Sequence, residues 1–196
     1  VSSQIGCKMG CKFCASTGIP FVRNLEAEEI VEQIIGAEQD LNERISNVVF
    51  MGIGEPFDNY ENVVKAIKII NDQKGINIGA RHISVSTSGI VPRIYDLAKE
   101  NIQCTLSISL HATTDEKRSS MMPINKKYNI EELIKACKDY IKITGRRVSF
   151  EYALAKDNND NIEDARKLVE LLKGMLCHVN LIPINKIENG NFLKSS

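Results

Sequence analysis

The sequence predicts an α/β fold in which parallel strands form a partial (β/α)6 barrel with helices packed outside. Hydrophobic periods of two and of 3.6 residues alternate along the chain, and the connections between them are short. The length of 196 residues suits about six strand–helix units, whereas a complete eight-unit barrel takes about 250 residues. Two neighbouring strands also carry serines on one face and aliphatic side chains on the other. A flat doubly wound sheet is the alternative that these observations leave open.

Strands are expected where short runs of apolar and β-branched residues lie between turn signals. In chain order these runs are 1–5, 48–51, 83–87, 106–110, 148–152 and 179–182. Helices are expected between them, where apolar residues recur every three or four positions. Their apolar stripes are Ile30, Ile34, Ala37 and Leu41; Val63, Ile67 and Ile70; Ile94, Leu97 and Ala98; Ile130, Leu133, Ile134, Cys137 and Ile141; and Ile162, Ala165, Leu168 and Leu172. The polar loop 157–161 is expected to cap the last helix.

The two central strands predict a polar interior. Residues 83–88 alternate Ile, Val and Thr with serines, and residues 106–111 alternate aliphatic residues with Ser107, Ser109 and His111. Because helices must cover the aliphatic faces, the hydroxyl faces point into the barrel. Closed barrels are filled by bulky side chains, so this lining indicates a cavity for a polar ligand. Two half-exposed strands of an antiparallel sheet are the simpler alternative.

The segment after the second strand is a candidate part of that cavity. Gly52 and Gly54 would let the backbone approach a ligand closely, and Glu55 can accept hydrogen bonds from an ammonium group. It lies at the carboxyl edge of the strands, where barrel sites assemble. A strand exit with a solvated glutamate is the alternative.

Composition excludes several classes of protein. There are 25 basic residues (Lys and Arg) and 25 acidic ones (Asp and Glu), so the formal net charge is zero. Any RNA contact therefore needs a local basic patch or parts outside this sequence. Arg118 and the pairs Lys126-Lys127 and Arg146-Arg147 could face phosphates; the two pairs are more typical of solvated surface, and none of these residues is assigned. No apolar run approaches the roughly 18 residues of a membrane span, so we expect no membrane contact and a cytoplasmic location.

Three of the six cysteines form a compact motif. Cys7, Cys11 and Cys14 give a C-x3-C-x2-C run on a loop, where three thiolates can converge on one soft metal centre. Structural zinc sites and ferredoxin clusters take four ligands, so three leave a metal position open for a small molecule. A [4Fe–4S] cluster is the main hypothesis, and zinc completed by a residue such as His178 is the alternative. The other three cysteines are expected to be small core residues: Cys104, Cys137 and Cys177.

The cysteine run, with Phe13 before its third cysteine, resembles the signature of the radical S-adenosylmethionine superfamily. The whole chain resembles one family within it, the RlmN/Cfr ribosomal RNA adenine methyltransferases. The segments that carry this resemblance are VSSQIGC at 1–7, RNL at 23–25, FMGIGEP at 50–56, NY at 59–60, STSG at 86–89, SLH at 109–111, MPI at 122–124 and HVNLIP at 178–183. The resemblance implies a partial (β/α)6 barrel, a [4Fe–4S] cluster on the three cysteines, and S-adenosyl-L-methionine bound at the open iron.

The resemblance also implies cofactor-binding residues. They are Gly54, Glu55, Ser86, Ser109, Leu110, His111 and Asn185. Gly54 and Glu55 would hold the methionyl amine. His111 would contact the ribose or carboxylate, and Asn185 the adenosine part, although Ile184 stands where the family often has an aromatic residue.

The reaction that the resemblance implies uses two molecules of S-adenosylmethionine. One methylates a cysteine near the C-terminus, and the other is cleaved by one electron to a 5′-deoxyadenosyl radical that activates this methyl group. The housekeeping branch modifies carbon 2 of an adenosine in 23S rRNA and in some tRNAs, with an electron donor such as flavodoxin or ferredoxin. Neither catalytic cysteine nor the RNA-binding domain of the family matches residues 1–196, so we assign no catalytic residue. We expect a core domain that binds cluster and cofactor but does not methylate RNA alone.

Other functions remain open at this point. The residues at 54–56 and 58–60 favour the housekeeping branch over the antibiotic-resistance branch, which methylates carbon 8. A plain electron-transfer module would need a fourth cysteine ligand. A zinc-stabilised RNA-binding module would need a basic face.

Overall fold

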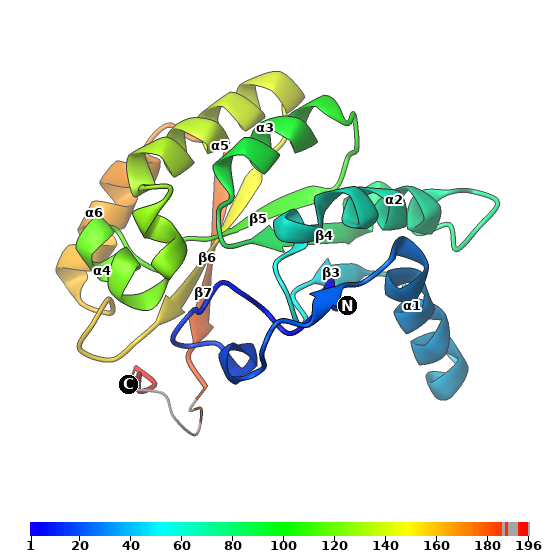
Figure 1. Ribbon diagram of the computed structural model, residues 1–196. Coiled ribbons are helices and arrows are strands. Elements are labelled where there is room, and N and C mark those ends of the chain that lie inside the picture. The colour runs from blue at the N-terminus through cyan, green and yellow to red at the C-terminus, as the bar shows by residue number, and fades with distance from the viewer. Residues whose placement is uncertain (186, 188–191, 196) are drawn as a thin grey trace.

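A twisted sheet of five parallel strands forms the centre of the computed structural model, which describes residues 1–185, 187 and 192–195 (Figure 1). The strands are β3 (Val48–Phe50), β4 (Ile83–Thr87), β5 (Thr105–Ser109), β6 (Val148–Leu154) and β7 (Cys177–Pro183). Every neighbouring pair is parallel. The predicted α/β class is therefore confirmed, and the antiparallel alternative is wrong.

The strand order decides between the two parallel architectures. A doubly wound sheet reverses its order at one point and carries helices on both faces. Here the order is sequential from β3 to β7, so right-handed crossovers place the helices on one side and leave the other side for a cavity. The helices are α1 (Ala27–Leu41), α2 (Tyr60–Asn71), α3 (Val91–Lys99), α4 (Asp115–Met121), α5 (Ile130–Thr144) and α6 (Ile162–Leu172). This is the arrangement of an open, partial barrel.

The two faces of the sheet differ as the serine pattern predicts. Ile83, Val85, Leu106 and Ile108 are fully buried in the main hydrophobic core beneath the helices. The serines alternate with them, and β4 and β5 pair in a register that sets Ser86 opposite Ser107. The core also contains Cys104 and Cys137, with Cys177 packed against it, as expected for small apolar residues.

The start of the chain departs from the expected first barrel strand. Only Gln4–Ile5 (β1) is a strand, and it pairs antiparallel with Arg23–Asn24 (β2), which the hydrophobic pattern does not predict. The segment still follows the edge of β3, since the Val1 amino group donates to the Val49 carbonyl at 2.8 Å and Gly52 N–H donates to the Val1 carbonyl at 3.0 Å. Gly6, at φ 75°, then turns the backbone into the cysteine loop, and the pairing of β1 with β2 ends there.

Helices α4 and α6 show how an ion pair overrides a hydrophobic pattern. The stripe expected in α6 includes Ile162, which is 70% exposed, whereas Asp164 is buried. Both Asp164 carboxylate oxygens accept hydrogen bonds from Lys117 of α4, at 2.6 and 2.7 Å. Helix α4 itself is not predicted, because Met121 is the one apolar residue among its seven. The Thr114 side chain caps it instead.

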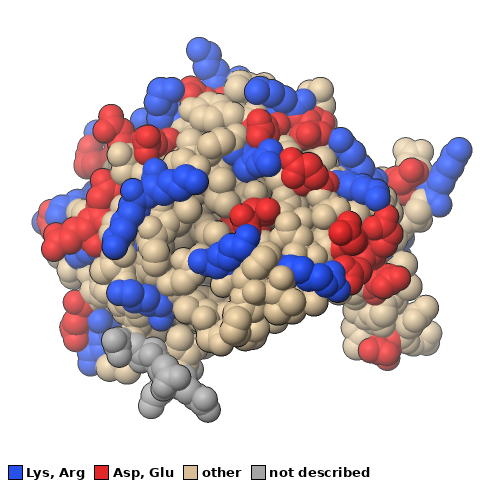
Figure 2. Space-filling model, in the orientation of Figure 1, with Lys and Arg blue, Asp and Glu red and all other residues tan. Residues whose placement is uncertain are grey.

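The surface mixes the two signs of charge. Figure 2 shows basic and acidic side chains interspersed over one face, in keeping with equal numbers of each in the sequence. Among the helices that the structure describes, none is both long and apolar enough to cross a bilayer.

Candidate functional site

A cavity of about 350 Å³ lies at the carboxyl ends of the parallel strands. Nearly every residue that the sequence analysis singled out lines it: Cys7, Cys11, Cys14, Gly54, Glu55, Ser86, Ser109, His111 and Asn185. Of the residues predicted to bind the cluster or the cofactor, Leu110 is the one that does not line it, because its side chain is fully buried in the hydrophobic core. Cavities of this size are typical of small-molecule sites.

The cysteine loop is held against the barrel by its backbone. Cys14 N–H donates to the Cys11 carbonyl at 3.1 Å, and the Thr17 hydroxyl donates to the same carbonyl at 2.6 Å. Lys12 N–H donates to the Met121 carbonyl at the end of α4, at 2.9 Å. These bonds direct three half-buried thiols toward one cavity without a disulfide.

The thiols suit a cluster better than a single ion. Within the described ranges, no three His, Cys, Asp or Glu side chains converge closely enough to hold one metal ion. His178, the ligand considered for a zinc site, is exposed on β7 and does not line the cavity. In an iron–sulfur cluster the thiolates are distributed over several irons, so they need to surround a volume and not a point. The donor set therefore fits a [4Fe–4S] cluster with three cysteine ligands.

Burial favours the protonated form of two of these thiols, Cys7 and Cys11. It raises the pKa of Cys11 to about 12, with further contributions from Cys14, Glu55 and Cys7. It also raises the pKa of Cys7. Because thiolates and not thiols bind iron, loading must release protons.

Glu55 supplies a buried carboxylate to the same cavity. Its side chain is 3% exposed and accepts hydrogen bonds from Phe57 N–H at 3.0 Å, the Thr87 hydroxyl at 2.6 Å and Ser88 N–H at 2.7 Å. Burial raises the pKa of this carboxyl despite those three donors. No lysine or arginine pairs with it in the part of the chain that the structure describes. A buried carboxylate without a cation is a receptor for one, and an ammonium group is a suitable ligand.

The glycines beside Glu55 have a structural reason that the sequence analysis missed. A Cβ on Gly52 would lie 2.6 Å from the Ser2 hydroxyl oxygen, and a Cβ on Gly54, at φ 107°, would lie 2.6 Å from the Gln4 Cβ. Gln4 in turn accepts from Glu55 N–H through its Oε1 at 2.9 Å. The glycines thus admit the N-terminal segment, which then fixes the Glu55 backbone.

His111 and Phe13 form another wall of the cavity. Their rings meet edge to face, with centroids 4.6 Å apart. Ala153 N–H donates to His111 Nδ1 at 2.9 Å, and Asn159 Nδ2 donates to the His111 carbonyl at 2.6 Å. Phe13 therefore anchors the cysteine loop on the end of β5.

Glu151 of β6 is a cavity residue that sequence reasoning missed. Its side chain is 5% exposed, and Oε2 accepts a hydrogen bond from Asn180 Nδ2 at 2.8 Å. The available signal was its alternation with Ser149, which puts both on the inner face of the strand. A single glutamate in an apolar run is too common to assign from that pattern alone.

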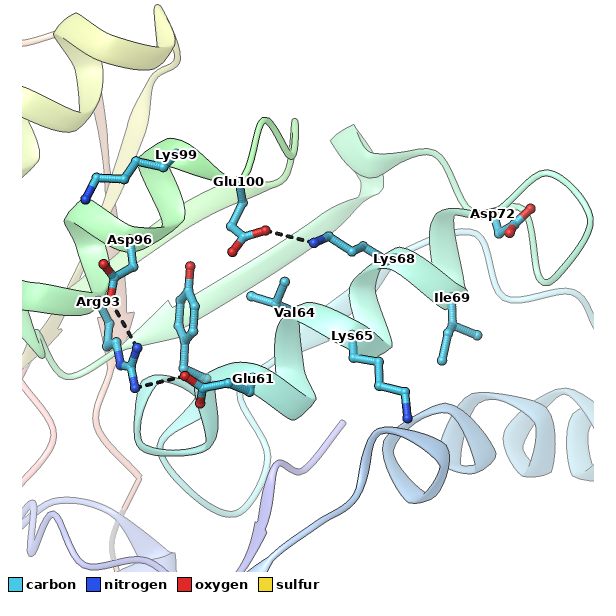
Figure 3. A pocket seen from close by; sticks show the side chains of 11 residues that line it. Glu61, Val64, Lys65, Lys68, Ile69, Asp72, Arg93, Asp96, Lys99 and Glu100 are labelled. Carbon is cyan, nitrogen blue, oxygen red and sulfur yellow. Dashed lines mark hydrogen bonds and ion pairs between the residues drawn. The ribbon is translucent and has the colours of Figure 1, made fainter.

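A larger hollow of about 730 Å³ lies on the outer face between α2 and α3 (Figure 3). Its charged walls pair with each other, since Arg93 lies 3.1 Å from Glu61 and Lys68 lies 2.8 Å from Glu100. Each of these ion pairs joins α2 to α3. The charges there link two helices, so we place the candidate site in the inner cavity.

Known proteins resemble the chain over its whole length. The family model for the radical SAM superfamily matches residues 1–169. The probable dual-specificity RNA methyltransferase RlmN of Clostridium acetobutylicum is 59% identical over 99% of this chain, and that of Clostridium botulinum strain Alaska E43 is 58% identical over 100%. The chain covers 56% of each of them, so it spans about half the length of these curated relatives.

Solved structures give the same result. A radical SAM methyltransferase from Sphaerobacter thermophilus superposes with a TM-score of 0.96 at 47% identity, covering 100% of this chain and 58% of that one. SuiB of Streptococcus suis, bound to S-adenosylmethionine, shares the fold at a TM-score of 0.70 and 16% identity, covering 98% of this chain and 42% of that one. With the family model matching most of the chain, and with the three cysteines of the motif facing one cavity, the chain belongs to the radical SAM superfamily.

Proposed function

We propose that residues 1–196 form the core domain of an RNA methyltransferase of the RlmN type. The domain binds a [4Fe–4S] cluster and S-adenosylmethionine, and the enzyme methylates carbon 2 of an adenosine in 23S rRNA and in tRNA. The observation that carries the proposal is that three cysteine thiols and the Glu55 carboxylate line one cavity. The 59% identity to the Clostridium acetobutylicum protein supports the same reaction class. A cytoplasmic location and a flavodoxin or ferredoxin as electron donor complete the proposal.

Residues of different chemistry bind different parts of the cluster and the cofactor. Cys7, Cys11 and Cys14 hold the cluster, and the Glu55 carboxylate binds the ammonium group of the methionyl part. When bound, the cluster supplies single electrons and S-adenosylmethionine supplies the methyl group and the radical chemistry. Hydroxyl and amide groups around the cavity then orient the sugar and base. Those groups belong to Ser86, Ser109 and Asn185.

Apolar side chains exclude water from the same space. Met121, Met122, Ala153, Ala155 and Ile184 form a small buried cluster, against which Cys11 and Phe13 pack. Met122 and Ile184 also line the cavity. A dry lining protects reactive species from solvent and strengthens the pairing of Glu55 with a cation.

The first experiment tests the cluster and the cofactor together. The purified protein is reconstituted anaerobically with iron and sulfide, reduced, and studied by electron paramagnetic resonance with and without S-adenosylmethionine. We expect a [4Fe–4S] signal that changes when the cofactor is added. Cys11→Ser should lose the iron, whereas Cys177→Ser, outside the cavity, should keep it. A signal indifferent to the cofactor would contradict the proposal.

A second experiment tests the reaction. Residues 1–196 replace the matching segment of the Clostridium acetobutylicum relative, and the chimera is expressed in bacteria that lack their own enzyme. Mass spectrometry of digested 23S rRNA should find methylation at carbon 2 of adenosine. Methylation at carbon 8 would assign the chain to the antibiotic-resistance branch. A cluster-loaded chimera that leaves RNA unmodified would refute the proposed activity.

A further inference from the structure

Arg118 of α4 is a completely buried arginine, with 0% of its surface exposed. It therefore does not face a phosphate at the surface, which the sequence had left open. Its guanidinium makes four hydrogen bonds: Nε to the Leu110 carbonyl at 3.1 Å, Nη1 to Asn125 Oδ1 at 3.0 Å, and Nη2 to the Ser88 and Ser109 carbonyls at 2.6 and 3.1 Å. All four acceptors are neutral oxygens.

The positive charge of Arg118 has no direct ionic partner within the described residues. The nearest acid in its network is Asp115, which it reaches only through the amide of Asn125, whose Nδ2 donates to Asp115 Oδ1 at 2.9 Å. A buried charge with hydrogen bonds but no counter-ion is costly, and proteins usually provide an anion for it. The adjacent cavity, which Ser88 and Ser109 line, is the place where an anion could balance the charge of this arginine.

The geometry connects Arg118 with the cysteine loop. Its acceptors Ser88 and Ser109 line the cavity at the ends of β4 and β5. One turn further along α4, the Met121 carbonyl accepts from Lys12 N–H of the loop, and Cys11 packs on the cluster that contains Met121. The arginine thus lies behind the wall of the cavity that the three thiols line, bonded to the carbonyls of two residues of that wall.

The electrostatic coupling follows from this placement. The Arg118 charge reaches the cavity wall, since it adds to burial in lowering the pKa of His111, which lines the cavity. Burial lowers the pKa of Arg118 to about 10, so the guanidinium stays charged at neutral pH. It is a fixed cation behind the cavity that the thiols line.

We propose that Arg118 is the counter-charge of the cluster held by Cys7, Cys11 and Cys14, which favours cluster loading and the reduced over the oxidised cluster. The inference rests on the proposed function. Three thiolates make the loaded site anionic, and one added electron makes it more so, so a fixed cation stabilises the reduced state more than the oxidised one. Arg118 is a positioning residue in this role, because all four hydrogen bonds of its guanidinium go to oxygens of the protein.

The test is the reduction potential of the cluster. Reconstituted proteins are titrated with dithionite, and the reduced cluster is followed by electron paramagnetic resonance together with iron content. Arg118→Met should shift the midpoint to a more negative potential, with the reduced state disfavoured on the order of tenfold, which equals about 59 mV for one electron. Arg118→Lys should stay close to the native protein, because it keeps the charge. Lys126→Met removes an exposed cation nearby and should change nothing.

Several outcomes would overturn the inference. One is a native midpoint in a folded, iron-loaded Arg118→Met protein; another is an equal shift in the Met and Lys variants, which would assign the effect to hydrogen bonding. If Arg118→Met does not fold, Asn125→Asp makes the same test, because it places a carboxylate next to Nη1 of Arg118 and neutralises its charge. An unchanged midpoint potential in that variant would also contradict the inference. A native protein that binds no iron would instead contradict the proposed function.

Discussion

The backbone holds the His111 ring in one tautomer. Because Ala153 N–H donates to Nδ1, the proton of the neutral ring lies on Nε2. Burial, followed by the charge of Arg118, lowers the pKa of His111 to about 3. His111 is thus a fixed hydrogen-bond donor at neutral pH and not an acid or a base.

We expect His111 to remain neutral from pH 8 down to about pH 4 in nuclear magnetic resonance spectra of the ring nitrogens. In the unfolded chain its pKa is about 6.5, so the unfolded state binds the proton first. The free energy of unfolding should therefore fall as the pH drops from about 6.5 toward 3. His111→Gln should remove this part of the pH dependence. A ring that titrates near pH 6.5 in the folded protein would contradict the assignment.

Glu55→Gln is expected to weaken binding of S-adenosylmethionine to the cluster-loaded protein. Loss of a charge-assisted hydrogen bond of about 1.5–3 kcal/mol corresponds to roughly 10- to 100-fold in affinity. Calorimetry measures the affinity, and Glu170→Gln on the exposed side of α6 is the matched control. Burial raises the pKa of Glu55, so binding to the native protein should weaken as the pH falls through that raised value and the carboxylate takes up a proton. Equal affinities for the native and Gln proteins would contradict the role.

Local chemistry explains which site residues could be predicted. The spacing of Cys7, Cys11 and Cys14 indicates a soft metal centre in any fold, and Glu55 follows a strand that ends in glycines. Arg118 carries no such signal. Its guanidinium bonds to Leu110 and Asn125, which lie within eight residues of it, and to Ser88, thirty residues away, and no periodic pattern marks these partners.

Helices α4 and α6 are joined by the Lys117–Asp164 pair, in which Asp164 is 2% exposed and Lys117 is partly exposed. Lys117→Met would leave the carboxylate buried without its cation. We expect a loss of about 3 kcal/mol in the free energy of unfolding, measured by urea titration, and recovery of most of it in the double variant with Asp164→Asn. Lys167→Met breaks an exposed pair on α6 and should cost less than about 1 kcal/mol. Equal costs for the two single variants would show that burial of the pair is unimportant.

Packing of β1 depends on Gly54. Gly54→Ala combines an unfavourable φ of 107° with a Cβ 2.6 Å from Gln4, so we expect a loss of about 1–3 kcal/mol in urea unfolding. Gly36→Ala, in the middle of α1 with no atom within 4 Å of the added Cβ, should raise stability by up to about 1 kcal/mol. A Gly54→Ala protein as stable as the native one would mean that the N-terminal segment is not fixed at this point.

Periodicity predicts most elements, and its failures have identifiable causes. Five of the expected strands and the long helices occur where the pattern places them. The short strand β2 and helix α4 have too few apolar residues to produce a period. In α6 the buried position is Asp164, because its partner Lys117 comes from another helix.

In the whole molecule, residues of the cysteine loop and of the barrel strands line the same cavity, so a cluster bound there should stabilise the folded state. A ligand that binds only the folded protein raises its melting temperature. We expect the temperature to rise on anaerobic loading, and hydrogen exchange of the loop 7–18 to slow. Cys11→Ser should abolish both effects, and Cys177→Ser should keep them. Loading that leaves the loop exchange unchanged would contradict this coupling.

The sequence alone determines the class of the fold and the kind of chemistry, because both are encoded in neighbouring residues. Alternating periods specify strands and helices, serine faces specify a polar interior, and cysteine spacing predicts the metal ligands. Only the tertiary structure decides that the order of strands leaves one face open, that the N-terminal segment occupies the space beside Gly54, and that Arg118 is buried behind the cysteine loop. The reason is physical: burial and electrostatic pairing depend on which distant segments meet, and no local pattern specifies those meetings.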